Sequence, residues 1–157
     1  MHAVARLTLN IYIDADACPV KEEVVRVADR HGIPVTLVSN TWMRGSEHPL
    51  VRKITVAEGA DAADDWIAEQ VVLGDIVITS DIPLAARCVE KGAKVLRPNG
   101  KPLGQDAIGM AVAMRDLSAH LRETGEITGG PAPFTKRDRS RFLDVLEASI
   151  QALKRGK

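Results

Sequence analysis

Short apolar segments alternate with amphipathic segments along the first 97 residues, and this alternation constrains the fold more than any other feature of the chain. Apolar runs predict strands, whereas apolar residues that recur every three or four positions predict helices. Strands that alternate with helices form a mostly parallel sheet with helices on both faces. We therefore predict a doubly wound α/β fold, with strands at residues 7–13, 35–38, 53–57, 75–79 and 94–96.

The last third of the chain has a different pattern, in which amphipathic helices follow one another without intervening strands. Apolar residues recur at helical spacing through residues 110–121 and again through residues 142–153. We expect these two helices to pack onto the sheet. The prediction is a single domain over residues 1–157, made of an α/β core at 1–97 and a helical C-terminal extension at 98–157.

The composition is that of a globular protein, because 45% of the 157 residues are apolar and 27% are charged. No window approaches the ~18 consecutive apolar residues of a spanning helix, so we expect no membrane segment. The first residues lack the apolar run of a signal peptide, and the two cysteines lie far apart, so we expect a cytoplasmic protein. No glycine-rich phosphate-binding motif is present, which argues against a nucleotide cofactor. The sequence gives no indication of the oligomeric state.

Aspartates follow the predicted strands at the edge of the sheet where such folds bind ligands. Asp14 and Asp16 come directly after the first strand, and Asp81 follows the strand at 75–79. The helix before that strand opens with Asp64 and Asp65. Helical spacing places Asp64 beside the apolar stripe of its helix, which favours it over Asp65 for reaching a neighbouring site. The sequence therefore predicts a cluster of carboxylates at one edge.

Several carboxylates in one place repel each other unless protons or a cation neutralise them. Oxygen ligands favour Mg²⁺ or Mn²⁺, and such a cation can activate water and stabilise charge on a phosphoryl group. Thr79 and Ser80, which precede the last of these acids, could orient a phosphate oxygen or a water. A simpler interpretation also exists for individual acids, because Asp61 and Asp81 have the character of helix N-caps.

Three motifs, at residues 14–21, 59–67 and 74–85, resemble those of the YaiI/YqxD family of uncharacterised bacterial proteins. Members of that family are commonly grouped with PIN-like domains, whose best-known representatives are metal-dependent ribonucleases. The resemblance implies acids after the first strand, on a mid-chain helix and after the following strand. The chain departs from the PIN pattern at Asp16, at Cys18 with its following proline, and in the two additional C-terminal helices.

The leading hypothesis is a metal-dependent nuclease that hydrolyses phosphodiester bonds, with RNA as the expected substrate. The hypothesis assigns catalysis to Asp14, Asp64 and Asp81, and ligation of Mg²⁺ or Mn²⁺ to the same residues with Asp16 and Asp65.

The charge distribution supplies a candidate surface for the nucleic-acid backbone. The first 96 residues carry 10 basic and 14 acidic side chains, whereas the last 61 carry 11 and 7. Arg137 and Arg139 belong to the basic excess, and we predict that they contact phosphates. The alternative is that they lie on an ordinary solvated helix face.

The sequence is also consistent with two other functions. A haloacid-dehalogenase-like phosphatase would use Asp14 as nucleophile and Asp16 as general acid, although Cys18 stands where those enzymes usually have threonine. The remaining alternative is a non-catalytic PIN-like module that binds RNA or a protein.

Overall fold

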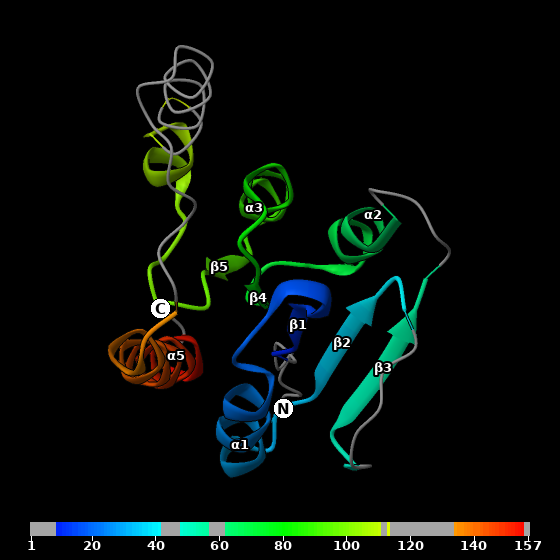
Figure 1. Ribbon diagram of the computed structural model, residues 1–157, viewed down its shortest axis with the longest axis vertical. Helices are drawn as coiled ribbons and strands as arrows, with labels where there is room; N and C mark the ends of the chain where they lie inside the picture. The colour runs from blue at the N-terminus through cyan, green and yellow to red at the C-terminus, as the bar shows by residue number, and fades with distance from the viewer. Residues whose placement is uncertain (1–8, 42–47, 57–61, 111–112, 114–133, 156–157) are drawn as a thin grey trace, which may run out of the picture.

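The computed structural model contains a five-stranded sheet in which every pair of neighbouring strands is parallel (Figure 1). The strand order is β3-β2-β1-β4-β5, so β1 lies at the centre. The strands are β1 (Ile11–Asp14), β2 (Val35–Ser39), β3 (Val51–Thr55), β4 (Ile76–Ile78) and β5 (Lys94–Leu96). The structure describes residues 9–41, 48–56, 62–110, 113 and 134–155. The predicted doubly wound α/β fold is confirmed.

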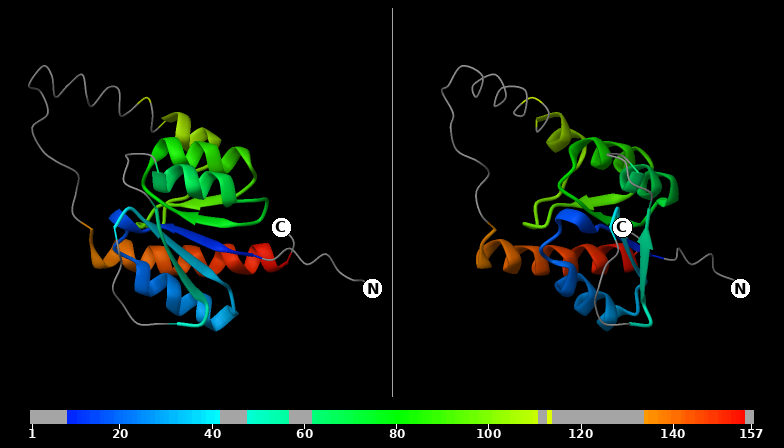
Figure 2. Two further views of the ribbon diagram at one scale, coloured as in Figure 1. Left: turned by 90° about the vertical axis from the view of Figure 1, so that its right-hand side faces the viewer. Right: turned by 45° about the vertical axis from the view of Figure 1, so that its right-hand side comes forward.

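Helices cover both faces of the sheet (Figures 1 and 2). Helices α1 (Lys21–His31) and α5 (Lys136–Lys154) pack on one face, against Ile11 and Ile13 of the central strand. Helices α2 (Ala62–Gln70) and α3 (Ile82–Glu90) pack on the other face, where the core includes Tyr12. Side chains of a strand alternate between faces, so one central strand contributes to two apolar cores.

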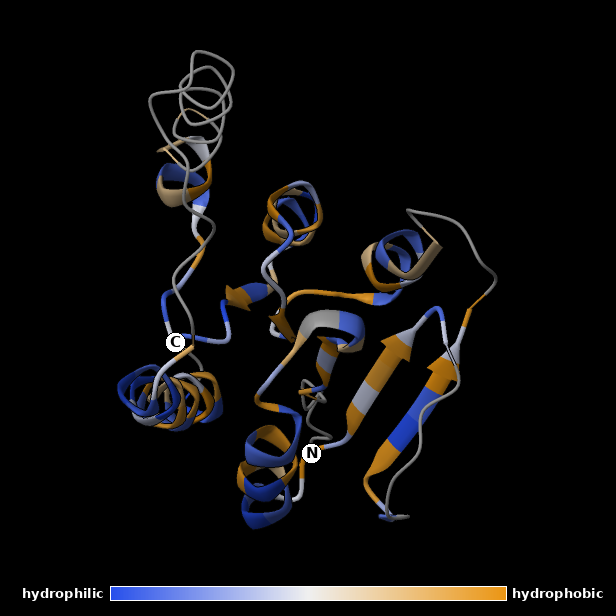
Figure 3. Cartoon of the chain, viewed as in Figure 1, coloured by the Kyte–Doolittle hydropathy of each residue, from blue (hydrophilic) through white to orange (hydrophobic). Residues whose placement is uncertain are grey.

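The edge strand β3 begins at Val51, two residues before the predicted strand at 53–57. Its middle is polar, as Figure 3 shows, because Arg52 and Lys53 stand there. Charged side chains are common on edge strands, where they discourage pairing with other chains. They also obscure the apolar pattern from which a strand is predicted, which explains the shift.

Capping residues set the ends of three helices. The side chain of Asp81 accepts a hydrogen bond from the Leu84 amide at 2.9 Å and so caps α3. Thr135 and Asp138 form a reciprocal capping box that begins α5. Helix α1 ends at Gly32, whose φ of 67° is in the left-handed region that glycine adopts most readily.

Helix α5 completes the apolar core of its face. Phe142, Leu146 and Ile150 are fully buried and belong to the same cluster as the strands and α1. The predicted helical segment at 142–153 is therefore confirmed. Of the other predicted segment, 110–121, the structure describes only residues 110 and 113, both helical, and residues 105–109 before it are also helical. Among the described residues, no helix has the length and apolar character needed to cross a membrane.

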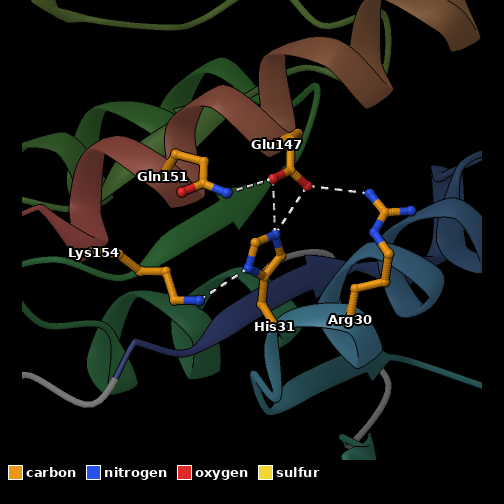
Figure 4. Close-up of polar contacts among 5 residues, drawn as sticks. All are labelled: Arg30, His31, Glu147, Gln151 and Lys154. Atoms are coloured by element: carbon orange, nitrogen blue, oxygen red, sulfur yellow. Dashed lines mark hydrogen bonds and ion pairs between the residues drawn. The ribbon is translucent and has the colours of Figure 1, made fainter.

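A polar network joins the C-terminal half of α5 to the end of α1 (Figure 4). Lys154 donates to Nδ1 of His31 at 3.0 Å, which leaves the ring proton of that histidine on Nε2. His31 Nε2 lies 2.9 Å from both oxygens of Glu147, which also accepts hydrogen bonds from Arg30 and Gln151. These bonds, that of His31 foremost, lower the pKa of Glu147 to about 2.

We predict that E147Q destabilises the protein in a pH-dependent way. Folding lowers the pKa of Glu147 from its usual 4.5 to about 2, so its stabilisation is complete above pH 4.5 and disappears as the pH falls through 2. The expected loss near pH 6 is about 1 kcal/mol, the upper range for partly exposed ion pairs. Urea unfolding of both proteins between pH 6 and pH 2.5 measures it.

The matched control is E22Q on the exposed surface of α1, since Glu22 forms no ion pair with any residue that the structure describes. A difference between E147Q and the wild type that stays constant over this pH range would contradict the assignment.

Candidate functional site

One hydroxyl group links the acids at the carboxyl edge of the sheet. Parallel pairing sets Ile13 of β1 opposite Ile78 of β4, so the next residues, Asp14 and Thr79, are neighbours. Thr79 Oγ1 donates to Asp14 Oδ2 at 3.1 Å and accepts from the Asp81 amide at 3.0 Å. The Thr79 side chain is buried, with 2% of the residue exposed, so this bridge is shielded from water.

Each of the two acids keeps one carboxylate oxygen clear of these bonds. Asp14 uses Oδ2 for Thr79, and Asp81 uses Oδ1 for the Leu84 amide. Within the described part of the chain, Asp14 Oδ1 and Asp81 Oδ2 accept no hydrogen bond. These two oxygens are therefore available to a cation or to water.

The electrostatic environment of Asp14 is unfavourable for its charged form. Burial is the main cause that raises its pKa, and the hydrogen bond from Thr79 opposes this effect. The charges of Asp81 and Asp16 raise the pKa further. A divalent cation at this edge would offset the excess of negative charge.

Asp16 lies at the same edge but its carboxylate is used for structure. It sits in a short 3-10 helix, η1 (Ala15–Ala17), and accepts a hydrogen bond from the buried Ser39 hydroxyl. Its other oxygen accepts from the Asn40 amide at 3.1 Å. Asp16 thereby ties the segment after β1 to the end of β2.

Asp65, the second of the two aspartates of α2, is directed toward α3. Asp65 forms an ion pair with Arg87 at 2.7 Å, and Asp64 acts electrostatically on Arg87 and Cys88. Over the residues that the structure describes, no group of three His, Cys, Asp or Glu side chains is placed to hold a metal ion. The structure thus brings Asp14 and Asp81 together most closely, through Thr79.

A hollow of about 240 Å³ opens beside Ser80, the residue between Thr79 and Asp81 in the chain. Its walls come from the segments that follow β1, β4 and β5 and from the start of α5, namely Pro19, Ser80, Arg97, Pro98, Asn99, Phe134 and Asp138.

Arg97 was not among the residues that the sequence pattern singled out. It directly follows β5 and is half-buried, with no ion pair to any described residue. The rule that identifies residues after strands at a ligand-binding edge applies to Arg97 as well, and would have found it.

The basic residues of α5 differ in how they are used. Arg139 pairs with the buried Glu23 of α1, and its guanidinium lies 5.3 Å from the centre of the Phe134 ring. Arg137 is exposed on the same helix. Arg139 therefore holds α5 in place, and Arg137 remains a candidate for contact with phosphate.

The fold and this edge define a parallel α/β protein with paired acids at the carboxyl edge of its sheet and a hollow beside Ser80. A family profile described as "Uncharacterized BCR, YaiI/YqxD family" matches residues 12–152, so this chain belongs to the YaiI/YqxD family. A UPF0178 protein of Parvibaculum lavamentivorans is 60% identical over 146 residues, which cover 93% of this chain and 96% of that relative. A UPF0178 protein of Rhodopseudomonas palustris strain HaA2 is 57% identical, with coverage of 93% and 89%. No solved structure gives a significant match.

We predict that T79V lowers the free energy of unfolding by about 1–3 kcal/mol, because it leaves the partly buried Asp81 amide without its acceptor. T79S keeps the hydroxyl and should retain more of this stability. The control is T36V in β2, because Thr36 is also buried (5% exposed) and its hydroxyl bonds to no described residue. Urea denaturation compares the three variants, and equal losses in T79V and T36V would contradict the bridging role.

Proposed function

We propose that this protein is a divalent-metal-dependent hydrolase of phosphodiester bonds. The observation that carries the proposal is the pair of acids, Asp14 and Asp81, joined by the Thr79 hydroxyl with one carboxylate oxygen left available on each. RNA is the first substrate to test, because the sequence motifs resemble those of a family grouped with PIN-like ribonucleases.

Two carboxylates are a sufficient protein contribution for Mg²⁺, which commonly keeps several waters and completes its coordination with substrate phosphates. We assign Mg²⁺ or Mn²⁺ to Asp14 Oδ1 and Asp81 Oδ2. When bound, such an ion polarises a phosphoryl oxygen and lowers the pKa of water. Asp16 is left outside the ligand set because both its oxygens accept hydrogen bonds.

Asp64 and Asp65 are also left outside this ligand set. Asp65 is paired with Arg87, and Asp64 lies in the same first turn of α2.

We assign separate roles to the other residues near this edge. Thr79 fixes the Asp14 carboxylate relative to the backbone of Asp81, and the Leu84 amide orients the Asp81 carboxylate. Arg97 binds a phosphate oxygen, for which a guanidinium has matching geometry. The exposed Ser80 hydroxyl, which also borders the hollow, donates to another oxygen of the same phosphate. Arg137 contacts the backbone further along the strand.

The phosphatase alternative needs Asp16 as a general acid directed at the phosphoester. The two oxygens of Asp16 instead accept hydrogen bonds from Ser39 and Asn40 at the end of β2. This engagement favours the nuclease proposal, in which Asp16 has only a positioning role.

We expect purified protein with Mn²⁺ to cleave a fluorescently labelled single-stranded RNA. D14N and D81N should each reduce the rate by roughly 100-fold or more, the scale on which loss of one electrostatic group in an active site is felt. D144N is the matched control, because Asp144 is exposed on α5 and makes no ion pair with a described residue.

The same assay separates the alternatives. Cleavage that D14N and D81N leave unchanged would overturn the proposal. Rapid turnover of a generic phosphomonoester without cleavage of RNA would support the phosphatase. Binding of RNA without cleavage of either substrate would support the non-catalytic module.

A further inference from the structure

The hollow beside Ser80 has a composition suited to one nucleotide unit. Its volume of about 240 Å³ lies below the ~300–1,000 Å³ of sites for drug-sized molecules, so it fits a group smaller than such a molecule. Phe134, Pro19 and Pro98 supply apolar wall, and Arg97 supplies a positive charge. Ligand sites commonly combine apolar wall with a few polar groups in this way.

The aromatic wall is held rigidly by charged neighbours. Arg139 lies over the Phe134 ring at 5.3 Å, and its guanidinium is anchored by the buried carboxylate of Glu23 on α1. The ring is therefore held by Arg139 of α5, which α1 in turn fixes through Glu23. A fixed aromatic ring is a stacking platform for a nucleobase that loses little conformational entropy on binding.

The opposite wall is fixed by close packing of the segment after β5 against α5. Gly100 has a φ of 89°, and a Cβ there would come within 2.8 Å of backbone atoms of Arg141 and Phe142. The Gly100 amide also donates to the Arg97 carbonyl at 2.8 Å. The backbone that carries Arg97 is thus set at a defined distance from the aromatic wall.

Polar groups in the hollow are mostly donors. The Oδ1 of Asn99 accepts the Lys101 amide at 3.0 Å, which leaves the side-chain NH₂ of Asn99 to donate to a base carbonyl. Asp138 is the single acid in the wall, and it is occupied by the Thr135 amide and by Arg141. A ligand with acceptor oxygens and a phosphate matches this set.

We infer that the hollow is a subsite for one nucleotide of a single-stranded substrate, with the base against Phe134 and its phosphate at Arg97 and Ser80. The inference rests on the proposed function and deepens it, because Ser80 connects the hollow to Asp81 along the chain. Because Ser80 precedes Asp81, a strand that continues from the hollow along this edge would carry the next phosphodiester toward the paired acids. Stacking on an aromatic ring accepts any base, so this subsite recognises single strands rather than a particular sequence.

Titration calorimetry of the full chain in EDTA tests the inference without metal or catalysis. The probes are adenosine 5′-monophosphate and ribose 5-phosphate, which differ by the base alone. The nucleotide should bind roughly tenfold or more tightly, since stacking of one base on an aromatic side chain has this scale. Equal affinity for the two probes would overturn the inference.

Variants then test the contribution of each wall of the hollow to binding. F134L should reduce the affinity for the nucleotide to that for ribose 5-phosphate, and F134W should retain the preference. R97Q should lower the affinity for both probes. The control R26Q, on the exposed surface of α1, should change neither affinity. A nucleotide affinity that F134L leaves unaltered would also overturn the inference. If F134L does not fold, the affinities of F134W and of the wild type for the two probes still test the inference.

The two proposals fail in different ways. If the protein prefers the nucleotide probe in EDTA but does not cleave RNA with metal, the subsite is supported and the proposed hydrolase activity is contradicted. Cleavage of RNA that depends on Asp14 and Asp81, with no preference for the nucleotide probe, would sustain the hydrolase and defeat the subsite.

Discussion

The parallel pairing of β1 with β4 is the constraint on which the rest of this site depends. Because Ile13 is in register with Ile78, the first residue beyond each pairing is an acid on one strand and a threonine on the other. The Thr79 hydroxyl then bonds both to Asp14 and to the Asp81 amide, while Asp81 caps α3. The register of β1 against β4, the start of α3 and the geometry of the two acids are therefore connected by the same set of hydrogen bonds.

Helix α5 determines what lies beside these acids. Its apolar side completes the core over the central strands. Asp138 in its first turn and Phe134, which precedes its N-cap, both line the hollow. Arg139, one of the basic residues of the C-terminal third, is engaged in holding α5 there through its pair with Glu23. The half-buried Arg97, which comes from the sheet rather than from α5, is left to attract an anion.

The alternation of apolar runs was enough to predict the parallel sheet, and the ends of its strands were enough to place Asp14, Thr79 and Asp81 together. These predictions rest on local pattern and on a general property of parallel sheets, so they do not require knowledge of side-chain contacts. The pairing of Asp65 with Arg87 could not be predicted in this way, because it depends on how α2 and α3 face each other. The use of Asp16 by Ser39 and Asn40 likewise depends on the meeting of segments distant in sequence.

The central claim is that Asp14 and Asp81 together hold one divalent cation. Anomalous diffraction from crystals of the protein soaked in Mn²⁺ tests it most directly. We predict a single strong peak within bonding distance of Asp14 Oδ1 and Asp81 Oδ2, which is lost in crystals of D14N. The absence of any peak at this position at saturating Mn²⁺, with both carboxylates accessible to solvent in the crystal, would contradict it.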